Sequence, residues 1–246
     1  MIEGMIQETI TDTCHVCKST NIVRNGTNRY GKAQYHCKDC GTYRVLKPKQ
    51  AYSETERQIV LRACLERCSL RGIARIFAIA RQTVARWFKE HAQNLPDVKE
   101  TLVPATPDDV LELDEIWSFV QKKEQTRWTW TAMCRRTRQI VAFVIGDRSK
   151  ATCLRLWEAI PEEYKYCHTF SDFWPAYRHI FPVETHHCVG KETGETAHME
   201  RWNNTLRQRL GRYVRQTLSF SKSDEYHYLV TLGFIVQYNS SLSLIT

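Results

Sequence analysis

The chain has 246 residues, of which 42% are hydrophobic and 25% are charged, the balance of a folded globular protein rather than a disordered one. No stretch approaches the ~18–20 consecutive apolar residues that a membrane-spanning helix needs. Residues 1–15 also lack a basic region followed by an apolar core, so they do not resemble a signal peptide. We therefore expect a cytoplasmic protein with no membrane partner.

The net charge of +8 is unevenly distributed along the chain. Residues 1–100 contain 17 Lys and Arg against 10 Asp and Glu, whereas residues 101–246 contain 18 against 17. A small basic N-terminal part favours a polyanionic partner, most often nucleic acid.

Composition shifts along the chain predict a multidomain protein, with a proline-containing linker near its middle. The predicted segments are 1–47 (a zinc ribbon), 52–92 (a helix-turn-helix domain), 93–108 (the linker) and 109–246 (an α/β catalytic domain).

Four of the ten cysteines form two CxxC pairs, separated by nineteen residues: Cys14, Cys17, Cys37 and Cys40. Each two-residue gap lets a tight turn aim both sulfurs at one point, so two pairs can complete a tetrahedral thiolate site for one structural Zn²⁺. The residues between the pairs resemble two strands around a turn near Asn25 and Gly26. Because about forty residues bury little core, the metal would stabilise this fold. Unrelated reduced pairs, disulfides, or substitution by His15 or His36 are the alternatives.

Residues 52–92 are helical in pattern. A capping box at Ser53 predicts a first helix, and Ser69 caps a second. A turn near 78–80 then leads to a third helix from about Arg81 to His91, with Val84, Trp87 and Phe88 facing inward. A recognition helix reads base edges from its N-terminal half. The outward-facing candidates for DNA contact are Arg81, Gln82, Thr83, Arg86 and Lys89. The alternative is a plain three-helix bundle with solvated charges.

Residues 109–246 alternate strand-like and helix-like stretches. Three strands, a helix, a strand, a helix, a strand and a helix are predicted in that order, which is the order of a ribonuclease H-like α/β domain. Their predicted bounds are 109–120, 127–136, 137–147, 149–159, 167–172, 174–181, 183–189 and 196–212.

Three carboxylates fit an active site in this order of elements: Asp114 on the first strand, Asp172 after the fourth strand and Glu200 on the last helix. Phosphodiester cleavage uses two divalent cations roughly 4 Å apart, and Mg²⁺ or Mn²⁺ prefers such oxygen ligands. We therefore predict that these three side chains hold two Mg²⁺ ions. Each alone has a plainer explanation, as a strand-end charge, a helix cap or an ion-pair partner.

Other acidic side chains compete for the third position. Glu112 shares a strand face with Asp114, and Glu115 points to the opposite face. Glu195 is the most plausible substitute for Glu200, whereas Glu192 fits a loop and Asp147 a turn or cap. The residues His186, His187, Cys188 and His198 are interpreted as core or pocket lining rather than as metal ligands.

The last helix carries Glu200, Asn203, Asn204 and Arg207 on one face, at i, i+3, i+4 and i+7. Amides and a guanidinium beside a metal carboxylate suit a DNA backbone at the active site. Residues 201–222 hold six Lys and Arg and no acidic residue, so further DNA contacts are predicted at Arg209, Arg212 and Arg215. Trp174 or Trp202 is a candidate for stacking on a flipped base.

Several long motifs then become recognisable, among them SLRGIARIF, LDEIWSFV, TRQIVAFVIGDRS, FSDFWPAY and VGKETGETAHMERWNNTLRQRLGRY. Over nearly the whole chain the sequence resembles transposases of the insertion sequence 1 family. The resemblance implies an N-terminal half that binds the terminal inverted repeats of the element. It also implies a catalytic half with an acidic (DDE-type) triad at Asp114, Asp172 and Glu200, and a basic catalytic residue at Arg207.

We therefore expect a DNA transposase that cleaves the 3′ ends of an insertion sequence and joins them to target DNA. The expected partners are double-stranded DNA and further copies of the chain on that DNA, at the nucleoid. No nucleotide-binding GxxxxGK[ST] motif is present. Two alternatives are a DNA-binding repressor with an inactive sheet domain, and a ribonuclease H-like nuclease, such as a junction resolvase, that acts without strand transfer.

Overall fold

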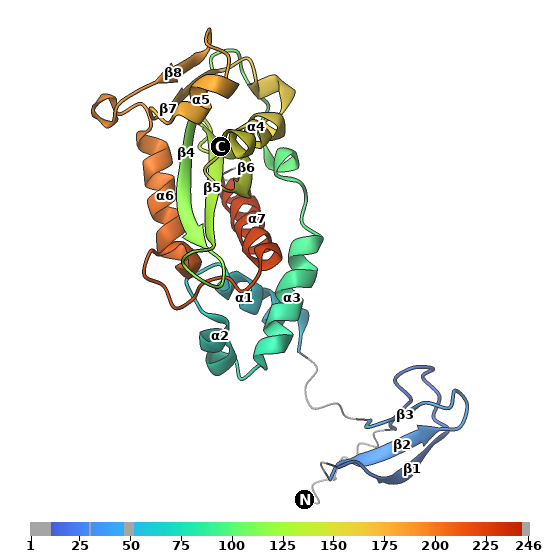
Figure 1. Cartoon of the computed structure of the whole chain (residues 1–246). Helices are drawn as coiled ribbons and strands as arrows, with labels where there is room; N and C mark the ends of the chain where they lie inside the picture. Colours follow the sequence, from blue (N-terminus) through green and yellow to red (C-terminus); the bar gives the residue numbers. More distant parts are fainter. Residues whose placement is uncertain (1–10, 30, 47–51, 243–246) are drawn as a thin grey trace, which may run out of the picture. The chain divides into compact units, whose positions relative to one another are not determined.

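The computed structural model describes residues 11–29, 31–46 and 52–242, and its contacts divide the chain into two compact units, Met1–Glu54 and Thr55–Thr246 (Figure 1). Residues 1–10, 30 and 47 of the predicted zinc ribbon, and the last four residues of the predicted catalytic domain, lie outside the described residues. The chain is α/β, as expected from the sequence.

The smaller unit contains a three-stranded antiparallel sheet in the order β1-β2-β3, formed by β1 (Ile22–Thr27), β2 (Ala33–Cys37) and β3 (Tyr43–Arg44). The turn expected near Asn25 and Gly26 is wrong. Gly26, with a φ of +70°, lies within β1 where the register shifts, so it forms a bulge rather than a turn. The hairpin instead closes farther along, where the Lys32 N–H donates to Asn28 Oδ1 at 3.0 Å.

Three helices begin the larger unit: α1 (Glu54–Ala63), α2 (Leu70–Ile76) and α3 (Arg81–Gln93). Ser69 caps α2 as predicted, because its hydroxyl accepts a hydrogen bond from the Gly72 N–H at 3.0 Å. Val84, Trp87 and Phe88 of α3 are buried, as the sequence pattern predicts. The outer face of α3 is therefore left for polar contacts.

A five-stranded mixed sheet organises the rest of this unit, in the order β6-β5-β4-β7-β8 (Figure 1). The strands β4, β5 and β6 are antiparallel, while β7 and β8 extend the sheet parallel to β4. Apolar and β-branched runs explain the long central strands. The strands are β4 (Val110–Phe119), β5 (Thr126–Cys134), β6 (Ile140–Gly146), β7 (His168–Ser171) and β8 (His186–Cys188).

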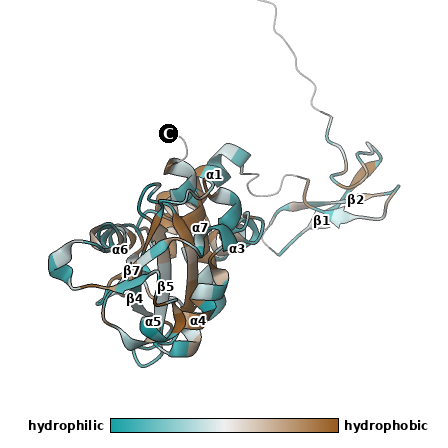
Figure 2. Cartoon of the chain, turned by 90° about the horizontal axis from the view of Figure 1, so that it is seen from above, coloured by the Kyte–Doolittle hydropathy of each residue, from teal (hydrophilic) through white to brown (hydrophobic). Residues whose placement is uncertain are grey.

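Helices cover both faces of the sheet. The face with Leu111, Leu113 and Trp130 forms a hydrophobic core with α4 (Lys150–Ala159) and α5 (Pro175–Ile180). The opposite face packs against α6 (Ala197–Arg209), the short 3-10 helix η4 (Gly211–Tyr213) and α7 (Asp224–Leu242). Hydrophobic colouring gathers along the strands and α7, consistent with their burial (Figure 2). The remaining 3-10 helices are η1 (Val98–Thr101), η2 (Glu162–Tyr164) and η3 (Lys191–Thr193).

The helix α7 has no counterpart among the elements expected from the sequence. It is buried on several sides, with Leu229, Phe234 and Asn239 all inaccessible or nearly so, because it packs against α3, η1 and β6. Asn239 completes hydrogen bonds at the edge of β6: its Oδ1 accepts from the Ile140 N–H at 2.8 Å, and its Nδ2 donates to the Ile140 carbonyl at 2.9 Å. A helix surrounded in this way has no polar stripe to show a helical period.

Residues 93–108, expected to be a linker, include the 3-10 helix η1 and make specific contacts with the sheet unit. The Val103 N–H donates to Gln139 Oε1 at 2.8 Å, and the Tyr164 hydroxyl donates to the Val103 carbonyl at 2.6 Å. In the described part of the chain, no helix is both long enough and apolar enough to cross a membrane.

Candidate functional site

The four cysteines of the small unit converge as predicted. Their sulfurs all lie within 4.8 Å of one another, with Cys14 and Cys40 at 3.6 Å and Cys17 and Cys37 at 3.4 Å. Two matching turns aim them. The residue after each CxxC pair has a left-handed backbone, Lys18 at φ +62° and Gly41 at φ +71°. In both turns this residue donates its N–H to the carbonyl of the pair's first cysteine at 2.9 Å.

These sulfurs fit a tetrahedral zinc ion. A Zn–S bond of about 2.3 Å requires sulfurs roughly 3.8 Å apart, close to the separations observed, whereas a disulfide requires about 2.05 Å. All four thiols are free. Neither His15 nor His36 belongs to the group of potential ligands in the described residues. The four cysteines are therefore the side chains that could hold a metal in this unit.

Asp114 lies near the middle of β4, opposite Thr131 of β5, on the sheet face that packs against α6. Burial, and after it the negative charge of Glu115, raise the pKa of its carboxyl group to about 7. The charges of Asp172 and Glu200 also raise this pKa. The fold therefore brings the three predicted carboxylates, which are 28 to 86 residues apart in sequence, into one electrostatic neighbourhood.

Asp172 and Glu200 reach this neighbourhood from other elements. Asp172 directly follows β7, whose parallel pairing with β4 ends at Glu112, two residues before Asp114. Its Oδ1 accepts a hydrogen bond from the Trp174 N–H at 2.9 Å, so it also forms the start of α5. Glu200 is exposed in the first turn of α6, where the helix dipole favours a carboxylate.

Asn203 connects α6 to this site. Its Nδ2 donates to Asp114 Oδ2 at 2.7 Å, and the side chain is buried, with 5% exposed. Its Oδ1 is buried and has no protein partner. We predicted Asn203 as a DNA contact, and in this position the amide orients Asp114. The buried, unpartnered oxygen of Asn203 lies beside Asp114, on which the charges of Asp172 and Glu200 also act, and such oxygens are a donor set suited to Mg²⁺.

These carboxylates lie less close together than the cysteine sulfurs. Among the described residues, only the four cysteines gather closely enough to hold a metal ion in their present positions.

The Glu112 side chain holds the start of α6 on the sheet, a role that the sequence pattern did not predict. Its fully buried carboxylate accepts hydrogen bonds from the backbone N–H groups of His198 and Met199, at 3.1 and 3.0 Å. It also pairs with Arg135 at 2.9 Å and with His198 Nδ1 at 2.6 Å. A carboxylate from β4 thus replaces the missing side-chain cap of α6 and fixes the helix that carries Glu200.

Glu115 points to the opposite sheet face, as predicted. The Tyr177 hydroxyl donates to its carboxylate at 2.8 Å and Arg148 Nε donates at 2.7 Å. Burial raises the pKa of this carboxyl group. The guanidinium of Arg148 lies over the rings of Trp128 and Trp174, 4.6 and 3.9 Å from their centroids. Sequence reasoning missed Arg148 because only the fold brings these side chains together.

The rival carboxylates have other partners. Glu195 Oε2 pairs with Arg135 at 2.8 Å, on the side of Glu112. Asp147 accepts from the Thr152 hydroxyl at 2.6 Å near the start of α4, which fits the turn predicted for it. Glu192 is exposed on η3. The largest charge effects on the pKa of Asp114 come instead from Glu115, Asp172 and Glu200.

The predicted DNA contacts fall into two groups. Arg81, Gln82 and Arg86 are exposed on α3, and Asn204 and Arg215 are exposed in the larger unit. Others have protein partners. Arg209 bonds Glu66, Arg212 donates to Ser221 Oγ at 2.8 Å, and Lys89 pairs with Glu225 at 2.7 Å. Burial and the charge of Arg215 lower the pKa of the partly buried Arg207, whereas the charge of Asp114 raises it. Trp202, 2% exposed, packs near Tyr238 and is not available to stack on a base.

The part of the chain that contains Asp114, Asp172 and Glu200 is similar to known proteins. A family model described as IS1 transposase matches residues 110–239. The iso-IS1n insertion element protein InsB of Shigella dysenteriae is 37% identical over 126 residues, which cover 51% of this chain and 93% of the relative. The IS1 protein InsB of Shigella flexneri is 38% identical over 116 residues, covering 47% and 86%. The IS1 4 protein InsB of Escherichia coli K12 is 37% identical over 116 residues, covering 47% and 67%.

The matched region runs from the start of β4 into α7, so it includes the five-stranded sheet, the helices on both its faces and all three carboxylates. It covers more than half of the chain. The chain therefore belongs to the IS1 transposase family.

Proposed function

We propose that this transposase binds the terminal inverted repeats of an insertion sequence, cleaves their 3′ ends and joins them to target DNA. The observation that carries the proposal is that the charges of Asp172 and Glu200, from two other elements, both act on Asp114 of β4. It is supported by the family match over the same elements. The arrangement of strands and helices is consistent with a ribonuclease H-like, DDE-type catalytic domain.

In this proposal Asp114, Asp172 and Glu200 hold two Mg²⁺ or Mn²⁺ ions. The bound ions would supply charge to activate the attacking oxygen, first of water and then of the freed 3′-hydroxyl, and to stabilise the leaving oxygen. Asn203 holds Asp114 in place, and Glu112 holds the first turn of α6. Arg207, near Asp114, would bind the DNA phosphate during the reaction.

The N-terminal half would supply end recognition. The four cysteines would hold one structural Zn²⁺ in a zinc ribbon, and α2 and α3 would form a helix-turn-helix. The exposed Arg81, Gln82 and Arg86 lie in the first half of α3, where base contacts are expected. We also expect several copies of the chain to act together on DNA.

The test is a strand-transfer assay with the full chain, on duplexes that carry the ends of the element encoding it. Asp114→Asn, Asp172→Asn and Glu200→Gln each remove one negative charge with little change of shape. Each should reduce cleavage by orders of magnitude, about 10³-fold or more, and leave end binding intact. The losses should be strongly non-additive, because the three side chains form one site.

Glu195→Gln and Asp147→Asn are the matched controls and should retain most activity. A robustly active Glu200→Gln protein would contradict the assignment, and so would an inactive Glu195→Gln protein that folds and binds the ends. Cleavage without joining would identify a nuclease instead, and end binding without cleavage would identify a repressor.

A further inference from the structure

An open recess of about 440 Å³ lies near the hairpin end of β4 and β5. Two indole rings, from Trp117 on β4 and Trp128 on β5, line it together with Lys123, Arg215 and Gln216. Trp117 and Trp128 are register partners, so their rings project from the same face of the sheet. The volume falls within the ~300–1,000 Å³ range of small-ligand pockets.

The lining combines aromatic surface with positive charge. Both indoles are partly exposed, whereas Lys123, Arg215 and Gln216 are exposed, and no carboxylate is among the lining residues. An aromatic face beside Lys and Arg suits a flat ring attached to an anion. A nucleotide has both parts: a base that stacks and a phosphate that binds a guanidinium.

A series of contacts connects the recess to one of the carboxylates. The guanidinium of Arg148 lies over the rings of Trp128 and Trp174, and the Trp174 N–H donates to Asp172 Oδ1 at 2.9 Å. Because side chains alternate along β4, Trp117 shares the sheet face of Glu115, whereas Asp114 faces α6. The recess therefore approaches the carboxylate site from the side of Asp172.

The loop that carries Arg215 and Gln216 is fixed at both ends. Before it, the buried Tyr213 hydroxyl lies 2.9 Å from the Thr129 hydroxyl and 2.7 Å from that of Thr231. After it, Ser221 lies 2.9 Å from His227 Nδ1 and accepts the Gln121 N–H on its carbonyl at 2.8 Å.

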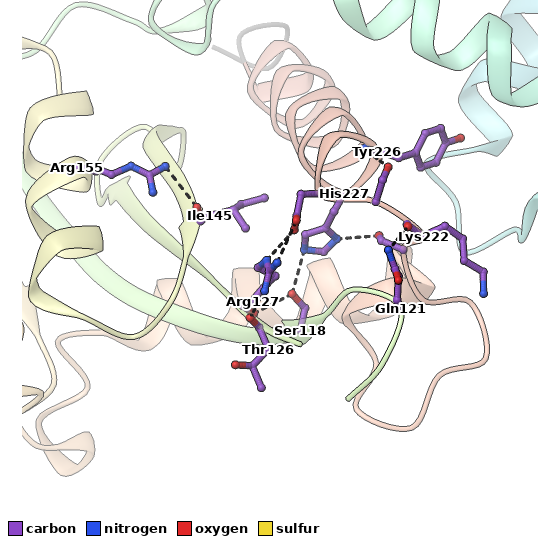
Figure 3. A network of polar contacts seen from close by, with 12 residues as sticks. Ser118, Gln121, Thr126, Arg127, Ile145, Arg155, Lys222, Tyr226 and His227 are labelled. Carbon is purple, nitrogen blue, oxygen red and sulfur yellow. Dashed lines mark hydrogen bonds and ion pairs between the residues drawn. The ribbon is translucent and has the colours of Figure 1, made fainter. Parts of the chain in front are cut away.

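His227 itself bridges Ser221 and Ser118, and Arg127 nearby pairs with Asp224 (Figure 3). These contacts hold the arch 214–223 against the end of the β4–β5 hairpin, so the recess exists without DNA.

We propose that the recess holds one unpaired nucleotide of the DNA strand next to the cleaved phosphate, with the base stacked on Trp117 and Trp128 and the phosphate bound by Arg215. Bases in an intact duplex stack on each other, so an indole in a recess reaches a base face only when that base leaves the helix. Because every base has such a face, the pocket selects for an unpaired nucleotide and not for one sequence. This inference rests on the proposed function.

The test uses the full chain and element-end duplexes with 2-aminopurine at successive positions around the cleavage site, with Ca²⁺ replacing Mg²⁺. Binding of the unmodified protein should change the fluorescence at one position far more than at its neighbours. Trp117→Leu, which keeps apolar volume but loses the ring, should abolish this position-specific change, and Trp117→Phe should retain it. Trp157→Leu, which loses an indole on α4 outside the recess, should not alter it.

A cleavage assay gives the second measurement. Trp117→Leu, which loses the stacking surface, and Arg215→Ala, which loses the phosphate contact, should each reduce cleavage of a fully paired end by about 10-fold. A mismatch at the identified position should restore part of the activity of Trp117→Leu, because the cost of unpairing is then removed. Arg155→Ala, an exposed arginine on α4, is the control for Arg215 and should cleave normally.

The outcomes separate this inference from the proposed function. If the unmodified chain cleaves ends in an Asp114-dependent manner but shows no position-specific fluorescence, the pocket assignment is wrong and the function stands. Equal signals in the unmodified protein and in Trp117→Leu would also overturn the pocket. If the unmodified chain neither binds nor cleaves ends, the proposed function itself fails.

Discussion

The two candidate metal sites of this chain are built in opposite ways. The cysteine site comes from two local turns with the same geometry, Cys14–Lys18 and Cys37–Gly41, in a unit with little hydrophobic core. The carboxylate site comes from β4, the end of β7 and α6, which a large core holds together. In the first, the metal would stabilise the fold; in the second, the fold brings the carboxylates into one neighbourhood, although not as close together as the four sulfurs.

The largest effect is expected where the metal itself stabilises the fold. Cys37→Ser should abolish zinc binding and unfold the four-cysteine unit, because zinc contributes about 10–16 kcal/mol to such folds. The larger unit should remain folded, since its core is separate. Metal analysis should find one zinc per unmodified chain and none in the variant, and hydrogen exchange should report loss of protection in 11–46 alone.

Cys68→Ser is the control, since this cysteine lies outside the cluster. An unchanged zinc content in the Cys37→Ser protein would show that the four cysteines do not hold the zinc, and the metal would then not stabilise this unit.

At the carboxylate site, the largest loss of folding stability is expected from substitution of Glu112, which holds the start of α6, rather than of the three predicted metal ligands. Glu112→Gln leaves Arg135 and the start of α6 without their buried anion, which should cost about 3–5 kcal/mol in the free energy of unfolding. Denaturant unfolding measures this loss. The exposed Glu192→Gln should be neutral. An equal effect of the two substitutions would show that Glu112 does not fix α6.

A smaller, pH-dependent effect is expected at His227, in the network that anchors the arch 214–223. Burial lowers the pKa of His227 to about 3, against about 6.5 when unfolded, so below pH 6.5 the unfolded chain binds a proton that the folded chain does not. Stability contributed by the neutral ring is therefore present above pH 6.5 and is lost as pH falls towards 3.

Between pH 7 and pH 5 this loss should be about 2 kcal/mol, measured as the free energy of unfolding of the full chain. His227→Gln removes the titrating group and should flatten this part of the profile. If His227→Gln shows the same change in the free energy of unfolding between pH 7 and pH 5 as the unmodified protein, groups other than His227 cause that change.

The smallest effect is expected on α3, which belongs to neither metal site. Arg86 is exposed, with only a 3.9 Å approach to Glu90, so Arg86→Ala should not alter folding. End binding by the full chain should weaken by about 1–3 kcal/mol if Arg86 contacts a base. If Arg86 contacts only a phosphate, the slope of the logarithm of the binding constant against the logarithm of the salt concentration should become smaller in magnitude by about one. Lys99→Ala, on η1, is the control of equal charge, and an identical result for both would contradict a specific role for α3.

The sequence by itself predicted what depends on local patterns. The CxxC spacing identified four ligands because two residues between cysteines suffice to form each turn. The order from β4 to α6 was correct because alternation and helical spacing distinguish strands from helices. Alternation along β4 also placed Glu112 with Asp114 and Glu115 on the other face. In contrast, α7 was missed, since a helix buried on several sides shows no period.

Only the tertiary structure decided which side chains meet. Sequence position alone left Glu195 open as a substitute for Glu200, and the fold separates them by pairing Glu195 with Arg135. It also brings Trp117, Trp128 and Arg215 around one recess and places Glu112 at the start of α6. Such contacts join residues up to about a hundred positions apart. They depend on strand pairing and on the packing of helices across a sheet, and no short window of sequence contains both partners.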